Sequence, residues 1–196
     1  MIPYLPFDLP RLRFRIFAAG DLPLFYRYRS NADVARFQGW APMTSAEARQ
    51  FVEEQRKINR LAPGTWAQLA IADRGSDELV GDIGIWLSHD SSAAEFGLTL
   101  MPEIQGQGFG TEAIRGIIDF LMLATPAMDV TAASDVRNEP CLGALRSAGM
   151  EQVATREQEY KGELCTEFVF RCSRADREIR TSPRLRPAGA HGGDLA

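Results

Sequence analysis

Alternating hydrophobic and polar positions predict the strands of a sheet. Residues 12–16 read Leu-Arg-Phe-Arg-Ile, in which apolar and charged side chains alternate as in a strand with one buried face. Similar strand-like runs occupy residues 66–72, 78–87, 93–101, 130–133, 151–159 and 164–171. Turn-forming residues separate most of them, so we expect a sheet built largely from neighbouring strands.

Helical periodicity is clearest in residues 111–124, where apolar residues recur every three or four positions. Further helices are predicted at residues 21–28, from the Thr44–Glu47 capping box to about residue 60, and at 138–148, where Gly149 ends the helix. Three prolines make residues 1–10 an irregular lead-in. The 196 residues therefore fit one mixed α/β domain, residues 11–172.

The last segment differs in composition and charge. Residues 173–196 are rich in Arg, Pro, Gly and Ala, with few large apolar residues, which predicts a flexible tail. They hold five arginines and three acids, so residues 1–172, with 17 basic and 23 acidic residues, carry a net charge of −6. An acidic body is a poor surface for nucleic acid and a plausible attractor for a cationic small molecule or a basic peptide.

Composition also limits the setting in which the protein works. The most apolar stretch, residues 116–128, contains Asp119 and Pro126 and is too short to span a bilayer, and the first residues do not resemble a signal peptide. Three cysteines without a CxxC spacing and two histidines argue against a disulfide framework and against a metal site. We therefore expect a cytoplasmic protein with neither a membrane span nor a metal.

A glycine-rich loop joins the strand at residues 93–101 to the helix that follows it. Glycines before a helix expose backbone N–H groups at the positive end of the helix dipole, which favours an anion such as a pyrophosphate. The loop does not match the Rossmann fingerprint, because Thr111 stands where the third glycine is required. It does not match a P-loop either, because the lysine of that motif is missing. The candidate anion-binding residues are Gln105, Gly106, Gln107, Gly108, Phe109, Gly110 and Thr111.

The same loop carries a family resemblance. The pattern Gln105-x-x-Gly108-x-Gly110 resembles the acetyl-CoA signature of the GNAT acetyltransferase superfamily. A second segment, with Asn138, Cys141, Leu145 and Gly149, resembles another motif of that family at the expected distance. The first strand and the segment YRSNADVARFQGW are similar to the group that acetylates ribosomal-protein amino termini, the RimJ/RimL-like group. The resemblance covers roughly residues 10–172.

The resemblance implies a GNAT fold: a central, mostly antiparallel sheet with helices on both faces and splayed strands that form the acetyl-CoA cleft. It implies transfer of an acetyl group from acetyl-CoA to a primary amine of a small molecule or a peptide. It is compatible with a homodimer as well as with a monomer. The strand at Leu98, Thr99 and Leu100 would bind the pantetheine, with an N–H near Thr99 or Leu100 polarising the thioester carbonyl. Asn138 would bind the pantetheine or cap its helix.

Two residues are candidates for catalysis. Glu95 resembles the glutamate that takes the amine proton in this family, although a solvated strand-edge carboxylate is the simpler alternative. Alternation places Glu95 on the face of Gly97 and Thr99. Leu145 stands where many family members have a tyrosine that acts as the general acid. Cys141 is the candidate to replace it: the thiol either protonates the leaving thiolate or only packs near it.

Aromatic residues suggest where the amine acceptor binds. Phe37, Trp40 and Trp86 are candidates for the wall of an acceptor pocket, with the core as the alternative location. His89 stands in a turn and is expected to be solvated. Because the usual tyrosine is missing, a sensor that binds acetyl-CoA without turnover is the competing hypothesis to an N-acetyltransferase.

Overall fold

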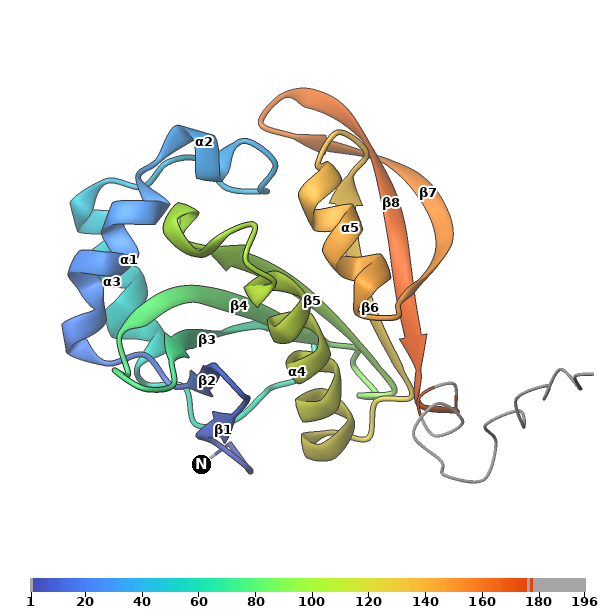
Figure 1. The fold of residues 1–196 in the computed structure, drawn as a ribbon, viewed down its shortest axis with the longest axis horizontal. Coiled ribbons are helices and arrows are strands. Elements are labelled where there is room, and N and C mark those ends of the chain that lie inside the picture. The colour runs from blue at the N-terminus through green and yellow to red at the C-terminus, as the bar shows by residue number, and fades with distance from the viewer. Residues whose placement is uncertain (1, 176, 178–196) are drawn as a thin grey trace, which may run out of the picture.

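The computed structural model describes residues 2–175 and 177 and shows one eight-stranded sheet in the order β1-β2-β3-β4-β5-β6-β8-β7 (Figure 1). The pair β5–β6 is parallel and the other neighbouring pairs are antiparallel. The strands are β1 (Phe7–Asp8), β2 (Leu12–Arg15), β3 (Trp66–Asp73), β4 (Leu79–Leu87), β5 (Ala93–Leu100), β6 (Asp129–Asp135), β7 (Glu151–Tyr160) and β8 (Glu163–Ser173).

Helices cover both faces of this sheet (Figure 1). On one face, α1 and α3 pack on β4 and β3 around a core that includes Phe25, Tyr28 and Val52. On the other face, α4 contacts β5 and β2 and packs beside α5 over a larger apolar core. The helices are α1 (Leu22–Arg29), α2 (Ala32–Ala35), α3 (Ser45–Gln55), α4 (Phe109–Ala124) and α5 (Glu139–Ser147), with short 3-10 turns η1 (Ala19–Asp21) and η2 (Pro102–Ile104). The predicted mixed, mostly antiparallel architecture is confirmed.

Several predicted boundaries were wrong. The Thr44–Glu47 capping box starts α3 as expected, but the helix ends at Gln55 and not near residue 60. Beyond it, the N–H groups of Lys57 and Ile58 bond only three residues back, so the helix tightens into a turn and stops. The lead-in contains the short strand β1, which pairs with β2 despite the prolines around it.

A buried ion pair fastens α1 to the sheet. Asp82 is fully buried in the middle of β4 and binds the guanidinium of Arg29 and the side-chain amide of Gln68. The Tyr28 hydroxyl donates to the other Asp82 oxygen at 2.7 Å. The ring of Trp40 lies over the Arg29 guanidinium at 4.2 Å and covers the pair from the helix side.

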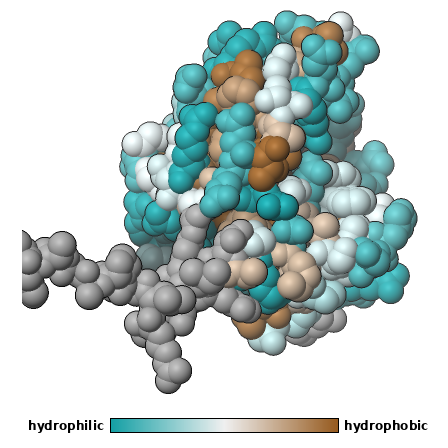
Figure 2. All heavy atoms as spheres, turned by 90° about the vertical axis from the view of Figure 1, so that its right-hand side faces the viewer, coloured by the Kyte–Doolittle hydropathy of each residue, from teal (hydrophilic) through white to brown (hydrophobic). Residues whose placement is uncertain are grey.

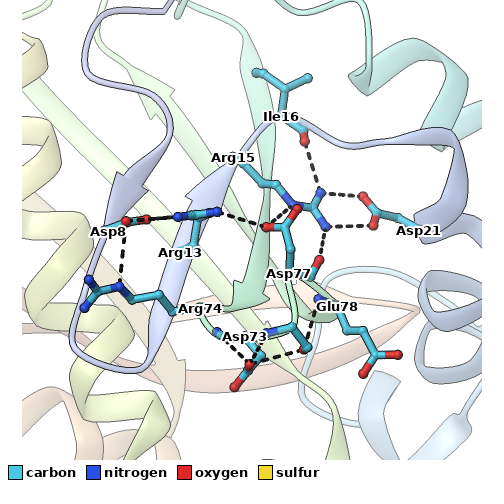
Figure 3. A network of polar contacts seen from close by, with 11 residues as sticks. Asp8, Arg13, Arg15, Ile16, Asp21, Asp73, Arg74, Asp77 and Glu78 are labelled. Atoms are coloured by element: carbon cyan, nitrogen blue, oxygen red, sulfur yellow. Dashed lines mark hydrogen bonds and ion pairs between the residues drawn. The ribbon is translucent and has the colours of Figure 1, made fainter.

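A second polar network holds β2 to the β3–β4 turn (Figure 3). Arg15 makes a two-pronged contact with Asp21 at 2.7 and 2.9 Å and donates to the Asp77 backbone carbonyl. Arg13 donates to Asp8 of β1 at 2.6 Å. Asp21 is the N-cap residue of α1, but its carboxylate does not cap the helix and instead binds Arg15 and the N–H of Ala18. The network therefore anchors the outer strands of the sheet.

Strand β7 is the last strand of the sheet, beyond β8, and most of its residues are exposed. Figure 2 faces this side of the molecule and shows a mainly hydrophilic surface with separate hydrophobic areas. Charged residues interrupt the strand, among them Glu151, Arg156, Glu157 and Glu159. Charges on an edge strand oppose pairing with another chain, which keeps this edge free.

The predicted tail, residues 173–196, lies mostly outside the described residues, which stop at 175 apart from residue 177. Ser173 still belongs to β8. Arg174 donates to the backbone carbonyls of Thr125 and Ala127, just after α4. Arg177 pairs with Asp119 of α4. The chain therefore stays attached to α4 up to these residues.

We expect Asp82→Ala to lower the free energy of unfolding by about 3–5 kcal/mol, because it leaves the buried Arg29 guanidinium without its partner. Tyr28→Phe removes one hydrogen bond and should cost about 1 kcal/mol. Urea denaturation followed by circular dichroism compares the two variants. Equal losses would show that the ion pair adds nothing beyond an ordinary hydrogen bond.

Candidate active site

The sheet opens between β5 and β6 (Figure 1). These strands pair only at Ala93–Asp129, Ala94–Val130 and Glu95–Thr131. Beyond Glu95, β5 stays paired with β4 and β6 stays paired with β8, so each strand is held on its outer side. The two facing backbone edges therefore diverge and form a splay, whose polar groups are available to an extended ligand.

Backbone alternation decides which groups of β5 face the splay. The Ala93 carbonyl accepts from the residue after β4, and the Met101 N–H donates to β4, both at 2.9 Å. The register between these two residues is continuous, so the Thr99 N–H also points to β4, whereas those of Leu98 and Leu100 point into the splay. Of the two residues expected to polarise the thioester through an N–H, Leu100 remains a candidate and Thr99 does not, and the N–H of Leu98 becomes a second candidate.

Two glutamines bind carbonyl groups on this open edge. Gln105 donates through Nε2 to the Leu100 carbonyl at 2.8 Å, and Gln38 donates to the Leu98 carbonyl at 3.3 Å. Both carbonyls thus already accept hydrogen bonds from amide groups. The amides of a pantetheine chain have the same hydrogen-bonding chemistry.

The glycine-rich loop lies at the N-terminus of α4. Gly106 and Gly108 have φ values of +73° and +81°, in the left-handed region that other residues rarely adopt. Gly108 is the N-cap residue of α4, and no side chain caps the first turn of this helix. The N–H groups of Phe109, Gly110 and Thr111 therefore point out at the positive end of the helix dipole. The loop fits the pyrophosphate of a nucleotide cofactor.

Arg11 is a cofactor-binding candidate that the sequence analysis missed. Its backbone N–H and Nε both donate to Glu112 at 2.7 Å, and Nη1 donates to the Gln107 carbonyl at 3.1 Å. The guanidinium stacks on the ring of Phe109 at 3.9 Å and lies 3.6 Å from the place of a Cβ on Gly108. An arginine fixed in this way adds positive charge to the anion-binding loop.

Glu95 stands at the point where the splay begins, on the face predicted for it. Arg156 of β7 lies 3.9 Å from its carboxylate, and Arg156 also donates to Glu167 of β8 at 2.8 Å. Burial raises the pKa of the Glu95 carboxyl, Arg156 lowers it, and Glu167 raises it further, with a net upward shift. The carboxylate is thus partly buried and a better base than an exposed glutamate.

Cys141 and Asn138 lie at the start of α5, on the opposite side of the sheet. Asn138 is the N-cap residue and accepts from the Cys141 N–H at 3.3 Å, so the predicted capping role of Asn138 is present. Cys141 is half-buried against the core, near Ser134 of β6. Burial raises the pKa of the Cys141 thiol, which keeps it protonated at neutral pH.

The three aromatic residues expected in an acceptor pocket occupy different positions. Phe37 is half-buried, and the guanidinium groups of Arg36 and Arg137 lie 5.0 and 5.9 Å from the centre of its ring. Trp40 covers the buried Arg29. Trp86 of β4 pairs directly with Glu95, so its indole shares the face of the candidate base. The structure brings Trp86 to Glu95 and places Phe37 and Trp40 on the segment after α2.

The β7–β8 turn reaches across to this segment after α2 (Figure 1). Lys161 Nζ donates to the carbonyls of Ala35 and Arg36 at 2.8 and 3.3 Å. Tyr160 lies so close to Gly39 that a Cβ there would be 3.2 Å from its ring. These contacts join the β7–β8 turn to α2 and the segment that follows it. Nothing in the sequence pattern indicated them.

Other features of the described residues do not point to a different site. A groove of about 650 Å³ lies by Ile2, Leu5 and Ile58 near β2, and none of the predicted site residues lines it. Within residues 2–175 and 177, no group of three or more His, Cys, Asp or Glu side chains could hold a metal ion. No described helix has the length and apolar character needed to cross a membrane.

Comparison with known proteins agrees with this geometry. The sequence model of the family described as "Acetyltransferase (GNAT) domain" matches residues 11–151. The chain belongs to the GNAT acetyltransferase family. It is 24% identical over 165 residues to the uncharacterized N-acetyltransferase p20 of Bacillus licheniformis, covering 82% of this chain and 91% of p20. The predicted family and acyltransferase class are thereby confirmed.

Solved structures of GNAT proteins share the fold. Spermidine N-acetyltransferase from Vibrio cholerae, in complex with CoA and spermine, has a TM-score of 0.72 at 16% identity, covering 85% of this chain and 97% of that protein. RimL, a ribosomal alpha-N-protein acetyltransferase in complex with coenzyme A, has a TM-score of 0.70 at 14% identity, covering 85% and 96%. At these identities the likeness concerns the fold alone.

We expect Arg11→Ala to weaken acetyl-CoA binding by about tenfold, because a charge-assisted contact to a phosphate and the order of the loop are both lost. The loss should shrink in high salt, which screens this partly exposed charge. Calorimetric titration at two salt concentrations measures it. Arg13→Ala, on the strand that begins just after Arg11, is the matched control, since Arg13 binds Asp8 and not the loop. Equal affinities in both variants would remove Arg11 from the cofactor site.

Proposed function

We propose that this chain is an acetyl-CoA-dependent N-acetyltransferase that acts on a primary amine of a small molecule or a peptide amino terminus. The observation that carries the proposal is the splay of β5 and β6, with Glu95 on one face and the anion-binding loop next to its far end. The resemblance to proteins named for spermidine and for ribosomal protein supports an amine as acceptor. Three free cysteines support a reducing, cytoplasmic setting.

Acetyl-CoA supplies the thioester whose acetyl group is transferred. Residues 105–111 and Arg11 would hold its pyrophosphate at the N-terminus of α4. The open edge of β5 would hold the pantetheine through the backbone of Leu98 and Leu100, with Asn138 at the opposite wall. Fixing the amine and the thioester in line supplies most of the rate enhancement that such a site can give.

Glu95 would remove the proton from the acceptor ammonium, directly or through a water molecule. The free amine nitrogen then forms a bond to the thioester carbon, and the bond from that carbon to sulfur breaks. An N–H of Leu98 or Leu100 would stabilise the charge that develops on the carbonyl oxygen. Cys141, a neutral thiol beside the start of α5, would give its proton to the departing sulfur. The nitrogen loses its second proton to solvent as the amide forms, and a proton from solvent restores the Cys141 thiol.

Turnover separates this proposal from the competing one, a sensor that binds acetyl-CoA without reaction. Release of free thiol from acetyl-CoA in the presence of a panel of primary amines, with acetylated product detected by mass spectrometry, supports an enzyme. Tight acetyl-CoA binding without thiol release from any amine in the panel would support the sensor. The structure favours an enzyme because Glu95 is held next to the splay and partly shielded from water.

We expect Glu95→Gln to lower kcat by about a hundredfold while acetyl-CoA affinity stays unchanged, because the backbone edge that binds the cofactor is untouched. The active form of Glu95 is the carboxylate, so wild-type kcat/KM should fall as the pH drops through its raised pKa. The Gln variant should lack this acidic limb. Glu157→Gln, an exposed carboxylate on β7, is the control. Full activity of Glu95→Gln would mean that another group removes the proton.

We expect Cys141→Ala to lower kcat and Cys141→Ser to keep part of the activity, because serine retains a hydroxyl that can donate a proton. The acid must be protonated to act, so wild-type activity should fall only at pH values above the ordinary thiol range, where the raised pKa of Cys141 lies. The pH dependence of kcat in the three proteins measures this. Unchanged activity of Cys141→Ala would assign the residue to packing alone.

A further inference from the structure

The face of the sheet that carries Glu95 has a floor made of glycine. Gly97 follows Glu95 on the same face of β5 and pairs with Gly84 of β4. Gly97 is exposed, and among the described residues no atom lies within 4 Å of the position that a Cβ would take. The space over Gly97 is therefore open, and this hollow, as we call it, adjoins Glu95, the preceding residue on the same face of β5.

Trp66 forms the far side of this hollow. A Cβ on Gly84 would meet two carbons of the Trp66 indole at 3.2 and 3.3 Å, so the ring lies against the bare backbone of Gly84. Trp66 is nevertheless 56% exposed. It pairs with Trp86, which pairs with Glu95, so the backbones of Trp66 and Glu95 are two strands, or about 10 Å, apart.

The charges around Glu95 favour a cationic acceptor chain that runs from the splay toward Trp66. On the opposite side of Glu95, the Arg156 guanidinium lies 3.9 Å from the carboxylate and would repel a second positive charge. On the side of Trp66, the path runs over Gly97, which carries no side chain, and ends at the Trp66 indole, which together with Gln68 covers Gly84. An exposed indole face attracts a cation through its ring electrons.

We propose that Gly97 and Trp66 select the acceptor: an unbranched primary amine whose chain lies over Gly97 and whose second cationic group rests on the Trp66 indole. This inference depends on the proposed N-acetylation and adds the class of amine. Gly97 determines specificity because any side chain at this position would fill the path of the acceptor. Trp66 determines specificity because it recognises the far end of the chain.

The first experiment compares 1,8-diaminooctane with octylamine, which has the same chain and only one amine. The diamine should have the higher kcat/KM with the full-length protein. Gly97→Leu should lower kcat/KM for the diamine by about tenfold or more, mainly through KM, with acetyl-CoA affinity unchanged. The matched control is Gly20→Leu, since a Cβ on Gly20 also meets nothing within 4 Å and Gly20 lies in η1, away from the splay.

Folding of the Gly97 variant is not at risk from backbone strain, because its φ lies outside the left-handed region. Trp66 gives an independent measurement. Trp66→Leu should reduce the preference for the diamine over octylamine to near one, and Trp66→Phe should restore part of it. A preference that survives in Trp66→Leu would overturn the role of the indole.

Two further results would overturn the inference while leaving N-acetylation in place. One is a kcat/KM in Gly97→Leu equal to that in Gly20→Leu. The other is efficient acetylation of peptide amino termini together with no acetylation of either linear amine. Absence of thiol release with every amine, including peptides, would instead overturn the proposed function itself.

Discussion

Backbone groups that lose their sheet partner create the site on which the rest of this molecule depends. Buried N–H and C=O groups normally find partners within the sheet. In β5 they do so only on the side of β4, because β6 leaves after three paired positions. Side chains of Gln38 and Gln105 bind two carbonyls of the open edge. Recognition by backbone does not require particular side chains, which is consistent with a fold shared across the family at low sequence identity.

The two faces of β5 carry different groups, because successive side chains of a strand point to opposite faces. One face turns to α4 and α5, where the glycine loop and Cys141 lie. The other turns to α1 and α3 and carries Glu95, Gly97 and Thr99. The buried pair of Arg29 and Asp82 holds α1 against this second face, so the face that carries Glu95 has a fixed helix beside it.

The sequence predicted the order of strands and helices because their hydrophobic periods are distinct, and alternation placed Glu95 on the correct face. The splay was expected only from the family resemblance. Hydrophobic periodicity could not show it, since the loss of pairing between β5 and β6 is a property of two strands that are far apart in sequence. Arg11 was missed because an arginine beside a strand reads as a surface residue. Trp66 and Gly97 were missed because only the register between three strands shows that they border the same hollow.

The pKa of Glu95 depends on how closely Arg156 approaches each of two carboxylates, Glu95 and Glu167. A guanidinium in direct contact with Glu95 would hold it as a stable ion pair, lower its pKa and weaken it as a base. Glu167 is almost fully buried and binds Arg156 at 2.8 Å, which leaves Arg156 at 3.9 Å from Glu95. Burial can then raise the pKa of Glu95, while the more distant positive charge limits the rise. Burial therefore outweighs the charge of Arg156, and the Glu95 carboxylate binds a proton more readily than an exposed glutamate does.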